Sequence, residues 1–141
     1  MDTKQSKKEK SLRRLIDANL NRSLEGMRVC EDFARFIINN RVLTQEMKKL
    51  RHSLLKAVRS FNLSNLELIF SRDIKSDVGK KSIFSEQKRV SLKHIVAVNL
   101  QRVKESLRVL EEYLKLYRET SEIKKIRYRL YAFEEKIAKF L

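Results

Sequence analysis

The sequence predicts an all-α protein: a four-helix bundle made of two duplicated helical hairpins with an irregular segment between them. The first observation is an internal repeat, because the stretch 14–37 recurs imperfectly as 94–117, so that Asn19 corresponds to Asn99 and Glu31 to Glu111. Both copies share the pattern N-L-x-R-x-x-E-x-x-R-V-x-E. The second observation is composition: the chain has no Pro, only two Gly, and 36% charged residues. Such a composition favours long helices over tightly turned β-structure.

The first repeat, 12–61, contains two predicted helices. We expect residues 1–11 to be a disordered or frayed basic N-terminus, and residues 12–141 to form a single helical domain. Residues 12–39 place their apolar side chains on one broad arc at about 100° per residue and end at an Asn-Asn stop signal. The second predicted helix covers 43–61, with Thr44 as its N-cap. A short connection makes these two helices antiparallel neighbours.

The second repeat, 92–141, mirrors the first. A third helix is expected over 91–119, and Thr120 and Ser121 are expected to cap a fourth that continues to the C-terminus. The fourth helix resembles the second, since IKKIRYRL at 123–130 matches MKKLRHSL at 47–54, with a shorter connection before it than in the first copy. The connecting loop 62–91, with a short helix or turn over 63–70, is expected to lie across one end of the bundle.

The charge and the rare residue types narrow the function. The formal net charge of +15 indicates either a solvated basic surface or a role for anions such as nucleic acid or small phosphates. Cys30 is the only cysteine, and two histidines alone do not suggest a zinc site. No apolar run approaches the ~18 residues of a membrane helix, and the polar N-terminus does not look like a secretory signal. We therefore expect a cytoplasmic protein with no membrane partner.

Polar residues interrupt the apolar arcs of the first and third helices. Asn19 and Gly26 fall near the centre of the first arc, with Arg22 about 60° to one side. Asn99 and Arg102 take the same angles in the third helix, so each copy is expected to send an Asn and an Arg inward. Gly26 would let a ligand approach the backbone.

Two further arginines, Arg51 and Arg127, lie close to the apolar stripes of the second and fourth helices and are expected to add charge to the same cavity. Buried guanidinium groups need anionic partners. Two explanations remain open: a pocket that binds phosphate, for which arginine forks are suited, or internal ion pairs with Glu31 and Glu111, or with Glu25 and Glu105.

The loop at 72–80 is a second candidate site. Arg72, Asp73, Asp77 and Gly79 could serve phosphates and a Mg²⁺ ion, which usually takes one or two carboxylates plus phosphate oxygens. The spacing matches no Walker motif, so an ordinary polar surface loop is the alternative.

These motifs together resemble a known family. DANLNRSLEGMRVCEDFARF (17–36), KKLRHSL (48–54), RDIKSDVGK (72–80) and VNLQRVKESLRVLEEYLKLY (98–117) are similar, in the same order and over about residues 12–135, to the small helical domain in front of thiamine-phosphate synthase in cyanobacteria and some other bacteria. That domain also occurs alone, as a short hydroxymethylpyrimidine-phosphate kinase often labelled thiamine-phosphate pyrophosphorylase. The chain lacks βα repeats and is shorter than the ~250 residues of a TIM barrel, so it should not itself be the synthase.

The resemblance implies ATP- and Mg²⁺-dependent phosphorylation of hydroxymethylpyrimidine phosphate to the diphosphate. In that hypothesis Asp73 and Asp77 are the catalytic and metal-binding residues. The phosphate- and substrate-binding residues are Asn19, Arg22, Gly26, Arg51, Arg72, Gly79, Asn99, Arg102 and Arg127. The catalytic base stays unassigned.

Two other function classes remain open. The protein could be a non-catalytic partner that docks on a separate thiamine-phosphate synthase, and an exposed helical surface also allows a homodimer. It could instead be a basic helical nucleic-acid-binding protein. We disfavour nucleic acid, because the repeated arginines are expected to point inward and few exposed aromatic side chains are expected for base stacking.

Overall fold

The computed structural model describes residues 3–141, and within that range the protein is all-α, with no strand. The helices are α1 (Thr3–Asp32), α2 (Arg41–Arg59), α3 (Asn65–Phe70), α4 (Phe84–Gln87), α5 (Leu92–Leu114) and α6 (Ser121–Ala138), with a π-helical turn, η1 (Phe33–Ile37), directly after α1. No helix in this range is long and apolar enough to cross a membrane.

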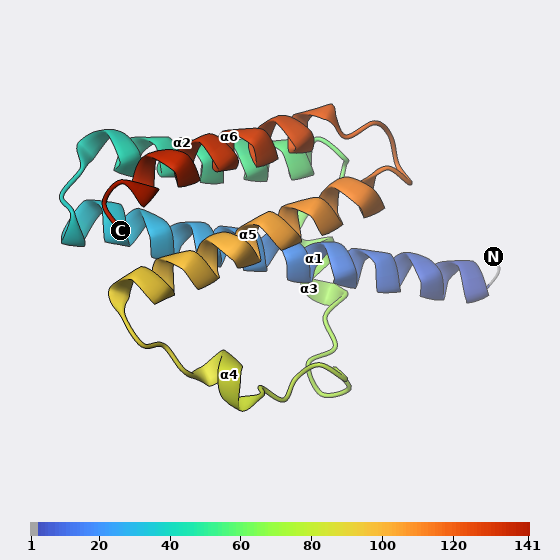
Figure 1. Ribbon diagram of the computed structural model, residues 1–141. Coiled ribbons are helices and arrows are strands. Elements are labelled where there is room, and N and C mark those ends of the chain that lie inside the picture. Colours follow the sequence, from blue (N-terminus) through green and yellow to red (C-terminus); the bar gives the residue numbers. More distant parts are fainter. Residues whose placement is uncertain (1–2) are drawn as a thin grey trace.

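The four long helices pack as a bundle around one apolar core. α1 contacts both α2 and α5, and α6 contacts the same two helices from the opposite corner (Figure 1). Buried Leu, Ile, Val, Met and Phe side chains from all four helices fill the space between them. Each α-helix of a hairpin thus presents one apolar face inward, as the helical periodicity of the sequence predicts.

Several helix ends differ from the sequence-based expectation. α1 already begins at Thr3 rather than at residue 12, while residues 1 and 2 of the expected frayed segment lie outside the described residues. α2 is capped by Asn40, whose side chain accepts a hydrogen bond from the Leu43 amide at 3.0 Å, and not by Thr44. Thr44 donates its hydroxyl to the Asn40 carbonyl instead, at 2.7 Å. The expected long third helix is shorter, because α5 ends at Leu114.

The segment 62–91 lies along the bundle and not across its end, so that expectation was wrong. It leaves α2, packs α3 against α1, and returns past α4 to the start of α5, on the side of the α1–α5 pair (Figure 1). Arg72 ties this segment to α1 through an ion pair with Asp17 at 2.7 Å. Much of the segment's apolar surface is exposed: Leu66, Phe70, Ile74, Val78, Ile83, Phe84 and Val90.

A tight helix contact joins α1 to α5 at Gly26. A Cβ atom at Gly26 would lie 2.6 Å from Cγ2 of Val103 and 3.1 Å from the carbonyl oxygen of Asn99. Next to it, the hydroxyl oxygens of Ser23 and Ser106 are 2.6 Å apart and fully or almost fully buried. Gly26 is therefore needed for α5 to approach α1, and the expectation that it opens the backbone to a ligand was wrong.

These two contacts are equivalent under the internal repeat. In the register that matches Asn19 with Asn99, Ser23 corresponds to Val103 and Gly26 to Ser106. Gly26 thus contacts the equivalent of Ser23, and Ser23 contacts the equivalent of Gly26. This reciprocity is what a two-fold relation between the repeats requires.

Gly26→Ala should destabilise the protein by about 1–2 kcal/mol. Overpacking of a tight core contact costs about 1–3 kcal/mol, and the helix propensity of Ala returns up to about 1 kcal/mol. Urea unfolding followed by circular dichroism measures the change. Gly79→Ala is the control, because its Cβ would meet only Asp77 Oδ1, at 3.5 Å. A Gly26→Ala protein as stable as the parent would contradict the tight contact.

Candidate functional site

A surface groove lies where α1 and α5 meet, and Glu86 of α4 borders it. Its volume is about 440 Å³ and it is lined by Asn19, Arg22, Glu86, Arg102, Glu105, Ser106 and Val109. We call it the α1–α5 groove. Arg22 and Arg102 occupy equivalent positions in the two repeats, and the structure brings them to this one groove. Because the lining contains two glutamates, Glu86 and Glu105, as well as the two arginines, it carries no net charge.

The two arginines are exposed. The sequence analysis had expected them to point into the bundle core, and that expectation was wrong. Their Cα atoms lie to one side of the centre of the apolar arc, and a long arginine side chain can bury its stem while the guanidinium reaches water. Asn19 is 4% exposed and Asn99 is half-buried. Each Asn donates its side-chain amide to the carbonyl four residues earlier, Leu15 at 2.9 Å and Ile95 at 2.8 Å. Asn19 lines the groove, whereas Asn99 is not among its lining residues.

Arg51 and Arg127 lie outside the α1–α5 groove, and each joins the two helices of its own hairpin. Arg51 on α2 donates to both carboxylate oxygens of the buried Glu31, at 3.0 and 3.1 Å. Arg127 on α6 pairs with the buried Glu111 at 2.7 Å. Ion pairing was one of the two explanations left open by the sequence, and it holds for both residues. Their phosphate binding stays a prediction.

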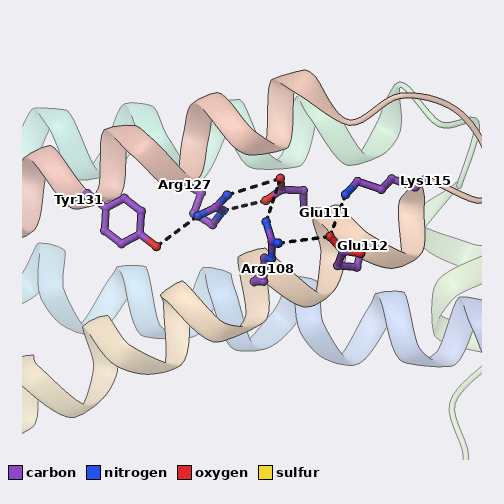
Figure 2. A network of polar contacts seen from close by, with 6 residues as sticks. All are labelled: Arg108, Glu111, Glu112, Lys115, Arg127 and Tyr131. Carbon is purple, nitrogen blue, oxygen red and sulfur yellow. Dashed lines mark hydrogen bonds and ion pairs between the residues drawn. The ribbon is translucent and has the colours of Figure 1, made fainter.

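The second of these networks is closed by neighbouring side chains. Figure 2 shows that Glu111 accepts from both Arg108 and Arg127, while Arg127 also donates to the Tyr131 hydroxyl at 3.2 Å. Tyr128 lies beside the same guanidinium, 5.4 Å from ring centroid to Cζ. The hydrogen bond to Glu111 raises the pKa of Arg127 above its ordinary value. Arg127 is therefore a fixed cation that is already satisfied within the protein.

The equivalent region of the first repeat is open. A pocket of about 710 Å³ lies between the end of α1 and the start of α2. It is lined by Arg28, Glu31, Arg35, Asn39, Asn40, Arg41, Thr44, Gln45, Lys48 and Arg51. We call it the hairpin pocket. Of these residues the sequence analysis had singled out only Arg51 as a candidate ligand. The sequence did contain a signal for this pocket: three basic residues lie near the Asn-Asn stop signal, Arg35 before it and Arg41 and Lys48 after it.

The loop at 72–80 folds on its own aspartates. Asp73 accepts from the Ser76 amide at 3.2 Å, and Asp77 accepts from the Gly79 amide at 2.9 Å, both through Oδ1. Each carboxylate keeps a second oxygen, although that of Asp77 lies 4.0 Å from Arg14. No group of three or more His, Cys, Asp or Glu residues suited to a metal occurs within 3–141. Two carboxylates fit the modest protein ligation of Mg²⁺, and the metal role of Asp73 and Asp77 stays a prediction.

Cys30 is not a candidate nucleophile. It is fully buried in the core, and burial, with a smaller effect of Glu134, raises the pKa of its thiol to about 12. A thiol that stays protonated and inaccessible is inert.

The fold and the two surface hollows define an all-α domain with an internal repeat, an electrically balanced groove and a basic pocket. Over residues 14–136 the chain matches the model of the ThiD2 family, and it belongs to that family. It is 39% identical over 127 residues to the thiamine-phosphate synthase of Nostoc punctiforme and 44% identical over 124 residues to that of Rhodopirellula baltica. These alignments cover 88% and 84% of the chain but only 34% and 32% of the relatives. The chain thus spans about a third of the length of these thiamine-biosynthesis relatives. No solved structure matches it significantly.

Glu111→Gln should cost about 2–4 kcal/mol of unfolding free energy, because it leaves Arg127, whose side chain is 12% exposed, without its charged partner. Chemical unfolding measures this loss. Glu112→Gln is the neighbouring control: its carboxylate is exposed and its ion pairs with Arg108 and Lys115 are screened by solvent, so no measurable change is expected. Equal losses in the two variants would contradict a structural role for the Glu111–Arg127 pair.

Proposed function

We propose that this protein is a phosphotransferase of thiamine biosynthesis that transfers a phosphoryl group from ATP to hydroxymethylpyrimidine phosphate, giving the diphosphate. The observation that carries the proposal is the convergence of Arg22 and Arg102, from the two repeats, on the α1–α5 groove. Membership of the ThiD2 family and similarity to one part of thiamine-phosphate synthases support it. Phosphoryl transfer asks a protein mainly for positioning and charge neutralisation, and this groove supplies both.

The substrate's phosphate and its pyrimidine ring require different partners, and the groove contains both kinds. Arg22 and Arg102 bind the phosphate as a two-sided clamp, since guanidinium forks match phosphate oxygens. Glu86 and Glu105 accept hydrogen bonds from an amino group on the ring. Asn19 has donated its amide to α1, so its carbonyl oxygen serves as an additional acceptor. A neutral lining with two arginines and two carboxylates suits a small polar monophosphate.

Mg²⁺ and ATP complete the proposed reaction. Asp73 and Asp77 would hold the metal through the carboxylate oxygens that their own loop does not use, and Mg²⁺ would neutralise charge on the transferred phosphoryl group. Arg72 is tied to Asp17, which keeps the loop on α1. Its role, and that of Gly79, is therefore to hold the loop in place in this proposal.

Arg22→Ala and Arg102→Ala should each lower kcat/KM for hydroxymethylpyrimidine phosphate by roughly 10- to 150-fold, the equivalent of a lost charge-assisted hydrogen bond of about 1.5–3 kcal/mol. A coupled assay of ADP release, with the diphosphate identified by mass spectrometry, measures the change. Arg59→Ala, at the exposed end of α2, is the matched control and should retain full activity. No turnover by the parent protein with ATP and Mg²⁺ would refute the kinase proposal.

A specific observation favours a second candidate, a docking function on a separate thiamine-phosphate synthase. The segment 62–91 exposes a run of apolar side chains that includes Ile83 and Phe84, which are 62% and 78% exposed. Patches of this kind mark interaction surfaces. If docking is the function, the protein should co-elute with the synthase on size-exclusion chromatography, and Ile83→Asp/Phe84→Asp should abolish co-elution. Separate elution of the two parent proteins would reject this candidate.

A further inference from the structure

We infer that the hairpin pocket is a second anion site, distinct from the α1–α5 groove, that binds an oligophosphate chain such as that of a nucleoside triphosphate. Charge is the first argument. Five cationic side chains and one carboxylate line the pocket. Arg28 and Arg51 contact Glu31. Arg35, Arg41 and Lys48 have no carboxylate within ion-pair distance among residues 3–141. Like charges gathered in one concave site repel, and a polyanion relieves that repulsion.

Arg51 provides the second argument. Its Nε is buried and has no hydrogen-bond partner within the described protein, although its Nη2 binds Glu31. A buried donor left unpaired costs free energy. In the second repeat the Nε of Arg127 donates to Glu111 at 2.7 Å, and Tyr131 and Tyr128 lie against the same guanidinium. In the register that matches Arg51 with Arg127, the first repeat holds Leu55 and His52 at the positions of these tyrosines. The first repeat therefore keeps the carboxylate, Glu31, but lacks the two tyrosines, and Glu31 binds Nη2 of Arg51 and leaves its Nε without a partner.

The two hairpins differ in length at this pocket. Glu31 is equivalent to Glu111 and Arg51 to Arg127, but four more residues separate the pair in the first hairpin. These residues form an additional helical turn in α2, because Arg51 follows the first residue of α2, Arg41, by ten positions, whereas Arg127 follows the first residue of α6, Ser121, by six. The turn before α2 contains η1 and Asn39, which has a φ of 52°. π-Helical turns occur frequently at functional sites.

The same turn places a helix N-terminus at the pocket. α2 is a 19-residue helix without an acidic residue in its first turn, and its first residue, Arg41, lines the pocket. The positive end of the helix dipole favours an anion there. This effect adds to the attraction of the cationic side chains and does not carry the inference without them.

The hairpin pocket and the groove flank α1 on different sides. Glu31 reaches Arg51 of α2, whereas Gly26 and Arg22 face α5. An occupant of the hairpin pocket is thus separated from the groove by the body of α1. The oligophosphate site is therefore a binding site of its own and does not depend on the kinase assignment of the groove.

Titration calorimetry with tripolyphosphate, ATP and adenosine tests the site. Arg35→Ala/Lys48→Ala should weaken tripolyphosphate binding by roughly tenfold or more, since each charged contact to an anion contributes about 1.5–3 kcal/mol. The matched control is Lys115→Ala/Lys124→Ala, which removes the equivalent charges of the second repeat and should leave binding unchanged. All four residues are exposed, so both variants should keep the parent's unfolding midpoint.

The outcomes separate the sources of the ligand and the two proposals. Equal affinity for ATP and tripolyphosphate identifies the phosphate chain as the ligand, and tighter binding of ATP identifies a nucleotide; both support the site. Binding of adenosine alone, no binding of any probe, or equal losses in the variant and its control would overturn it. Arg22→Ala should retain tripolyphosphate binding, so failure of the kinase proposal and failure of this one give different results.

Discussion

The close approach of α1 and α5 is the constraint on which the rest of the structure depends. Gly26 admits the backbone of α5, and the buried Ser23–Ser106 hydrogen bond satisfies two hydroxyl groups at the same crossing. A larger residue at 26 would force the repeats apart. Because the crossing is nearly symmetric, it also sets Arg22 and Arg102 beside each other at one groove. In our proposal the groove shared by both repeats is the substrate site, and its position follows from helix packing.

Within each hairpin, one buried carboxylate joins the two helices. Glu31 and Glu111 each accept from an arginine one turn earlier on their own helix and from an arginine on the next helix. Such pairs contribute little net stability but are costly to break, so they fix which faces of the two helices meet. The same chemistry then has two outcomes. Tyrosines close the second network, as Figure 2 shows for Tyr131, and the first remains open toward the hairpin pocket.

Sequence reasoning predicted the helices and the repeat well, because periodicity and duplication are properties of the chain itself. It placed Asn19 correctly near the core and failed for Arg22 and Arg102. A helical wheel gives the direction of Cβ, whereas the end of a long side chain depends on what surrounds it. It also assigned Arg51 to the same cavity as Arg22 and Arg102, although Arg51 and the α1–α5 groove lie on different sides of α1. The packing of the helices decides which side of α1 each neighbouring helix covers. A helical wheel describes one helix alone and cannot predict that packing.

The greater length of the first hairpin was visible in the sequence, and its meaning required the structure. In the second repeat the arginine is enclosed by protein groups. In the first, α2 has an additional turn before Arg51, and the turn formed by η1 and the left-handed Asn39 contributes Arg35 and Arg41 to the same pocket. Charge then separates the two sites. The α1–α5 groove balances its arginines with carboxylates, and we propose a monophosphate there; the lining of the hairpin pocket has a surplus of positive charge, and for that reason we propose a longer phosphate chain there.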